Sequence, residues 1–98
     1  MLDDIKLSLR ISNTAFDTEI NDLIDAAKLD LGISGVEKIE TKDEEDKLIV
    51  SDPLIKRAVT LYVKANFGWD NPDSERLQES YLMLKQHLSL SGDYNVVE

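Results

Sequence analysis

The chain has 98 residues, and 20 acidic residues against 11 basic ones give it a formal net charge of −9 at pH 7. This length indicates one domain with a modest core, and a hydrophobic fraction of 42% is enough for folding. The absence of cysteine excludes a disulfide framework and a thiolate metal site, and it fits a reducing cytoplasm. The charge argues against tight DNA binding, because cations supply most of the affinity for phosphates.

Apolar spacing predicts an all-α fold, a small bundle of about four helices, of which the first two cover residues 2–10 and 14–32. The first carries acids in its first turn, which suits the positive end of the helix dipole. In the second, Thr14 is the expected N-cap and Gly32 the expected end. One apolar stripe lines this second helix, formed by Phe16, Ile20, Leu23, Ile24, Ala27 and Leu31.

A long acidic loop is predicted at residues 33–51. Six acids and two lysines between Glu37 and Asp46 favour hydration, and we expect this stretch to be mobile in the free subunit. The flanking VEKI and KLIV favour β structure, so a short β-hairpin or two extended pieces would close the loop. Its acidic run lacks the spacing of an EF-hand and is interpreted as a solvated, partner-facing surface, with a weak divalent-cation site as the alternative. The run consists of Asp43, Glu44, Glu45 and Asp46.

The third helix is predicted at residues 53–67 and should be the most buried element. Asp52 is a favourable N-cap, and Pro53 occupies the first helical position, where no amide donor is needed. Apolar residues cover more than half of its circumference, as in a helix packed on two sides. Gly68 is expected to end it.

The fourth helix is predicted at residues 72–90, because Asn71-Pro72 repeats the cap-plus-proline signal. The domain then spans 1–90, and 91–98 form a mobile tail. Aromatic and apolar side chains outside the helical pattern are candidate contacts with other subunits or partners, since such residues are enriched at interfaces. They are Trp69, which could instead plug the space between helix ends, and Tyr94, Val96 and Val97 in the tail.

No arrangement of residues points to catalysis, a cofactor or a metal. His87 is the single histidine of the chain and has no expected nucleophile or orienting acid beside it. No apolar run approaches the ~18 residues that cross a bilayer, and the acidic start does not suit a signal peptide. The sequence therefore predicts a soluble, unprocessed protein that is not an enzyme and does not contact a membrane.

The order of the helices carries a resemblance. Glu19 followed by LIDAAKLDL from Leu23, then DPLIKRAVTLYVKANFG from Asp52 and an N-P-D turn at Asn71, are the relevant segments. Over residues 2–90 the chain resembles the head–tail connector (adaptor) proteins of long-tailed bacteriophages and prophages, often labelled DNA-packaging proteins.

The resemblance implies a structural virion protein at the head–tail junction, made in the cytoplasm of the bacterial host. Such proteins form a ring of about a dozen copies under the portal, with each copy contacting the next through two different surfaces. Partners would be further copies of the chain, the portal protein and the next connector or tail-completion protein, with DNA passing nearby without tight binding. Two alternatives stay open: a small helical regulatory module that binds another protein, and an acidic DNA mimic.

Overall fold

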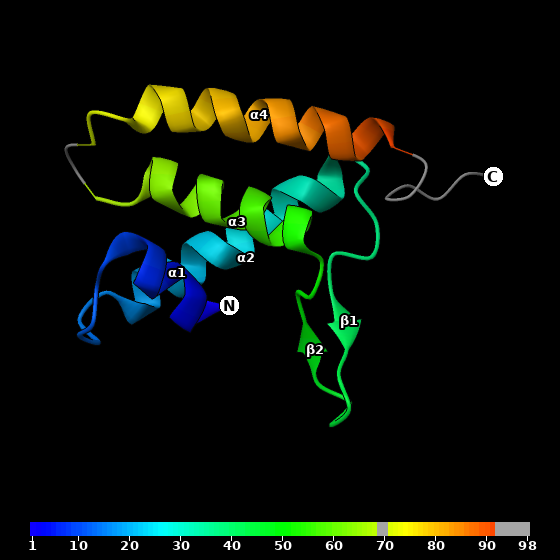
Figure 1. The fold of residues 1–98 in the computed structure, drawn as a ribbon, viewed down its shortest axis with the longest axis horizontal. Helices are drawn as coiled ribbons and strands as arrows, with labels where there is room; N and C mark the ends of the chain where they lie inside the picture. Colours follow the sequence, from blue (N-terminus) through cyan, green and yellow to red (C-terminus); the bar gives the residue numbers. More distant parts are fainter. Residues whose placement is uncertain (69–70, 92–98) are drawn as a thin grey trace.

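The computed structural model describes residues 1–68 and 71–91. These residues form four α-helices and one small antiparallel sheet (Figure 1). The prediction of a small bundle of about four helices is confirmed, and the sheet makes the chain mostly rather than purely helical. The elements are α1 (Leu2–Leu9), α2 (Asp17–Ile33), β1 (Thr41–Lys42), β2 (Leu48–Ile49), α3 (Pro53–Asn66) and α4 (Ser74–Leu90).

Helix α3 lies at the centre of the helical body. It packs against α1, α2 and α4, and α4 runs antiparallel beside it (Figure 1). This arrangement agrees with its two-sided apolar pattern, because each side of the helix has a neighbour to cover it. The core is formed by side chains that are at most 6% exposed, among them Ile5, Ile20, Ile24, Ala27, Leu31, Ile55, Ala58, Val59, Val63, Tyr81 and Leu88.

The two ends of α3 follow their local sequence signals. The Asp52 carboxylate accepts hydrogen bonds from the amides of Leu54 at 2.8 Å and Ile55 at 3.2 Å, so it satisfies two of the free donors of the first turn. Pro53 is the first helical residue. Gly68 follows the helix with a φ of +85°, a conformation that glycine adopts without steric cost.

The start of α4 differs from the predicted range of 72–90. The helix begins at Ser74, and the Asn71 side chain bridges the preceding turn, where its Oδ1 accepts a hydrogen bond from the amide of Asp73 at 3.0 Å. The side-chain amide group of Asn71 donates to the carbonyl of Lys64 at 2.6 Å, and the Ser74 hydroxyl donates to the carbonyl of Ala65 at 2.8 Å. The turn thus satisfies carbonyl groups that the end of α3 leaves free.

The predicted start of α2 at Thr14 is also wrong, since the helix begins at Asp17 and Thr14 makes no side-chain cap. Contacts from distant parts of the chain hold the preceding turn. The ring of Phe16 meets the ring of Phe67 edge-on at 5.5 Å, and Lys6 pairs with Asp17 at 2.8 Å. Phe16 is nevertheless 43% exposed and does not extend the buried stripe.

The end of α2 lies beyond the predicted Gly32, which is helical. The left-handed residue is Gly35, with a φ of +96°. Its amide donates to the carbonyl of Gly32 at 3.1 Å, and the amide of Val36 donates to that of Leu31 at 3.0 Å. This pattern is the Schellman motif, which brings apolar residues on either side of the turn together. Val36 and Leu31 both belong to the buried core, which explains why the helix ends here.

The acidic loop contains the β-hairpin that its flanks allow. β1 and β2 pair antiparallel, with Thr41 opposite Ile49, and the hairpin projects away from the helices (Figure 1). The second strand lies within KLIV, as predicted. The first does not lie in VEKI, because Val36 is buried at the end of α2 and Lys38 has a left-handed φ of 56°.

Candidate assembly surfaces

The predicted acidic contact residues lie at the tip of the hairpin. Asp43 forms the turn itself: its Oδ1 accepts hydrogen bonds from the amides of Glu45 and Lys47, both at 2.9 Å. Asp46 has a left-handed φ of 64° and pairs with Lys42 at 3.3 Å. Both aspartates therefore shape the turn, as aspartate commonly does.

Two glutamates form the outer surface of this tip. Glu44 and Glu45 are exposed, and no ion pair involves their carboxylates among the described residues. They are neighbours within the turn that the hydrogen bonds to Asp43 form. A role of the whole acidic run in partner contacts stays a prediction, and its sharpest candidates are Glu44 and Glu45.

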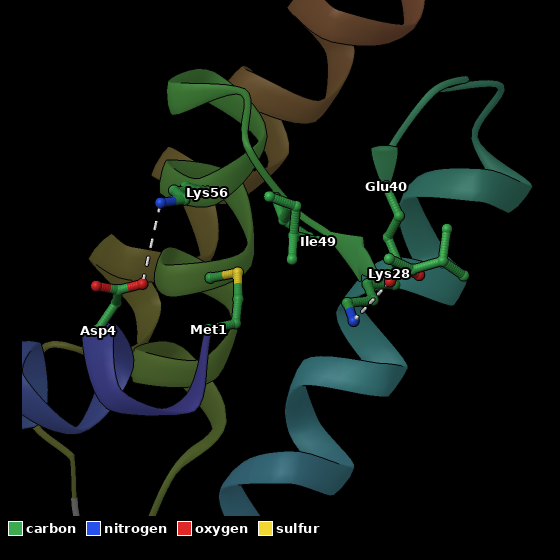
Figure 2. Close-up of a pocket in the computed structure, with 8 residues that line it drawn as sticks. Met1, Asp4, Lys28, Glu40, Ile49 and Lys56 are labelled. Carbon is green, nitrogen blue, oxygen red and sulfur yellow. Dashed lines mark ion pairs between the residues drawn. The ribbon is translucent and has the colours of Figure 1, made fainter. Parts of the chain in front are cut away.

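A hollow of about 260 Å³ lies where the hairpin meets the helices (Figure 2). Two ion pairs border it: Lys28–Glu40 at 3.5 Å, from α2 to the loop, and Lys56–Asp4 at 4.0 Å, from α3 to α1. Met1 and the hairpin residues Leu48, Ile49 and Val50 add apolar lining. The hollow thus has both charged and apolar walls.

A polar cluster that the sequence analysis missed joins α2 to α4. The Tyr81 hydroxyl donates to Asp30 at 2.5 Å, and Lys85 reaches the same carboxylate oxygen at 3.0 Å. The Tyr81 ring also meets Tyr62 edge-on at 5.2 Å. A signal existed in the sequence: a tyrosine on the inner face of a helix must place its hydroxyl against a polar partner.

The charges in this cluster are coupled. Burial of Asp30 acts to raise its pKa, but the hydrogen bonds from Tyr81 and Lys85 outweigh it and hold the pKa below its usual value. Burial, followed by the neighbouring Asp30 carboxylate, raises the pKa of Tyr81. Tyr81 thus remains a neutral donor at physiological pH. The cluster thus ties α4 to α2 through the Asp30 carboxylate.

Large apolar side chains are exposed over several elements. Phe16 was predicted to belong to the inner stripe of the second helix and is instead part of this exposed set. Where several such side chains lie together, exposed apolar surface commonly marks protein–protein contact. The exposed large hydrophobic residues are Leu7, Phe16, Leu29, Ile33, Leu48, Ile49, Leu54, Leu82, Met83 and Leu90, with exposures from 39% to 80%.

The remaining residues considered in the sequence analysis are either exposed or outside the described part of the chain. His87 is exposed on α4. The described part of the chain holds no group of three or more His, Cys, Asp or Glu side chains that could bind a metal ion, and none of its helices is long and apolar enough to cross a membrane. The predicted contacts of Trp69, Tyr94, Val96 and Val97 lie outside the described residues.

Comparison with known proteins identifies the family. A family model described as phage connector protein matches residues 1–95, which is nearly the whole chain. No curated protein and no solved structure matches the sequence.

The match confirms the resemblance seen in the order of the helices. Connector proteins are structural, non-enzymatic components of the virion that contact other head and tail proteins, and the described surfaces agree with such a role. By this match the chain belongs to the phage connector protein family.

Proposed function

We propose that this chain is a subunit of the head–tail connector and that about a dozen copies close into a ring beneath the portal, extending the channel through which DNA passes. The observation that carries the proposal is the exposed apolar surface. Leu29 and Ile33 on α2, and Leu82 and Met83 on α4, are all more than half exposed. Contact with other copies or with neighbouring head and tail proteins would remove these side chains from water.

The charge of the chain supports a channel that does not hold DNA. A net charge of −9 opposes the phosphate backbone, and weak contacts would be lost at moderate salt. DNA could therefore move along the ring without being retained. The proposal places the protein at the head–tail junction of the virion, with the portal protein and the next connector or tail-completion protein as neighbours.

The proposal also divides the chain by role. Residues 1–90 would form the folded domain, while 91–98 would serve contacts with neighbouring subunits. Deleting 91–98 is expected to leave the melting temperature nearly unchanged and to weaken ring formation or attachment to the portal.

The direct experiment mixes the purified chain with its portal protein and images the product by negative-stain electron microscopy. A ring of connector density on the portal is expected. The double variant Leu82→Ser with Met83→Ser should fold normally and form fewer rings, because it removes apolar surface that the subunit alone leaves exposed.

A matched control replaces two exposed polar residues on the same helix, Glu79→Ser with Gln86→Ser, and should form rings as the unchanged chain does. The proposal would be contradicted if the chain stayed monomeric at high concentration and also did not bind the portal protein.

A further inference from the structure

A basic groove runs between α3, α4 and the end of α1, with a volume of about 490 Å³. Four of the 11 basic residues of the chain line it: Lys56, Arg57, Lys64 and Arg76. No acidic side chain is among the lining residues. The groove therefore reverses, locally, the sign of a chain whose net charge is −9.

The positive charge of the groove is only partly neutralised within the subunit. Lys56 pairs with Asp4 at 4.0 Å and Arg76 with Asp73 at 3.5 Å, and these side chains are between 44% and 72% exposed, so the pairs are weak. Arg57 and Lys64 form no ion pair within the described part of the chain. The groove can therefore accept carboxylates from outside the subunit.

The hairpin tip offers the matching group. Glu44 and Glu45 are exposed on a turn fixed by Asp43, and Leu48, beside the turn, is 60% exposed. The hairpin projects away from the helical body (Figure 1), and across residues 1–68 and 71–91 no ion pair joins its tip to the groove. The tip and the groove of one subunit thus remain available for other copies.

We propose that the hairpin tip of one copy docks in the basic groove of the next, with Glu44 and Glu45 facing Arg57 and Lys64. This inference rests on the proposed ring and names the contact that builds it. One tip and one groove per copy make a head-to-tail contact, and such contacts close into a ring when the rotation between copies allows it. Leu61 and Leu77 also line the groove, and Leu48 of the docked tip would add apolar contact to the ion pairs.

The whole-molecule charge favours an acidic protein segment over DNA as the occupant. A DNA duplex in the groove would extend beyond the basic residues and set further phosphates against the acidic remainder of the subunit, whose net charge is −9. A narrow turn with two carboxylates needs complementarity only within the groove. Pairs between arginine and carboxylates are also among the stronger charged hydrogen bonds.

The test uses two charge-reversal variants. The tip variant carries Glu44→Lys with Glu45→Lys, and the groove variant carries Arg57→Glu with Lys64→Glu. Each alone would set like charges against each other, so self-association measured by sedimentation velocity should weaken at least about tenfold. An equimolar mixture should assemble again, because each tip then meets a groove of opposite charge in an alternating ring.

A matched control, Asp22→Lys with Asp25→Lys on the exposed side of α2, changes the net charge by the same amount as the tip variant and should associate as the unchanged chain does. If both reversal variants formed normal rings on the portal, the docking would be overturned while the proposed function stood. Failure of the mixture to recover assembly would also overturn it. If the unchanged chain formed no ring with or without the portal, the proposed function itself would fail.

Binding of a short DNA duplex provides a further arm. The unchanged chain should show no salt-resistant binding. The proposal would be wrong if the duplex bound to the unchanged chain but not to the groove variant, and if the tip variant assembled normally. The groove would then be a nucleic-acid-binding site.

Discussion

Helix α3 and the β-hairpin are adjacent in sequence, yet they are held in opposite ways. α3 has five buried residues and packs against three other helices. Both hairpin strands are exposed along their whole length, and the turn is held by hydrogen bonds to Asp43. Apolar burial dominates folding energy, so α3 should determine whether the chain folds. The hairpin contributes little core, which leaves its surface for contacts with other molecules.

The largest effect is expected from Val59→Asp on α3. Val59 is completely buried, and an unpaired charge there should cost several kcal/mol and unfold the domain. Circular dichroism melting checks this. Met83→Asp is the control, since Met83 is 73% exposed and the same change should leave the melting temperature nearly unchanged. A Val59→Asp chain that melts like the parent would refute the central position of α3.

A smaller effect is expected from Tyr81→Phe, which removes the hydrogen bond to Asp30 and should destabilise the fold by about 1–2 kcal/mol. The pKa of Asp30 is lowered on folding. The ionised Asp30 carboxylate therefore stabilises the fold fully above the pKa of the unfolded state, about 4, and this stabilisation is lost as the pH falls below that value. Chemical denaturation at pH 7 and pH 3 should therefore show a smaller difference between parent and variant at pH 3. An equal difference in unfolding free energy at both pH values would show that the Tyr81 hydrogen bond does not depend on the charge of Asp30.

The N-cap of α3 allows a more limited change. Asp52→Ala removes the acceptor for the amides of Leu54 and Ile55 and should cost about 1 kcal/mol. Asp52→Ser keeps a capping oxygen and serves as the control. Urea denaturation distinguishes the two variants, and equal stabilities would show that the cap has no energetic role.

The sequence predicted elements well where the determining residues are neighbours in the chain. Asp52-Pro53 and Gly68 set the ends of α3 through local conformational preference, and the structure agrees. Prediction from the sequence failed where contacts between distant residues determine the boundary of a helix. The start of α2 depends on the meeting of Phe16 and Phe67, which local capping rules cannot show.

The same division applies to the surfaces. The acidic tip is a continuous run in the sequence, so it was recognised as a candidate contact. The basic residues of the groove come from α3 and α4 and are up to 20 positions apart, whereas only Lys56, Arg57 and Lys64 are near neighbours in the sequence. Arg76 joins them because Asn71 and Ser74 fasten the start of α4 to the end of α3.

The smallest perturbation is hydrogen exchange of the unmodified chain, which compares the two regions directly. Amides from Glu37 to Asp46 should exchange fast, because the hairpin can open without exposing the core. Amides in the middle of α3, around Val59 and Val63, should exchange only on global unfolding. Similar protection in both regions would show that the hairpin is part of the cooperative fold.

The most direct test of the division between a folding helix and a contact-making hairpin is to shorten the hairpin. Replacing residues 43–47 by Asn-Gly, which favours a tight two-residue turn, removes the acidic tip and keeps the helices. Melting temperature and ring formation on the portal are then measured on the same sample. We expect the melting temperature to stay within about 4 °C of the parent and ring formation to be lost. Rings that form as readily as those of the parent would contradict the account.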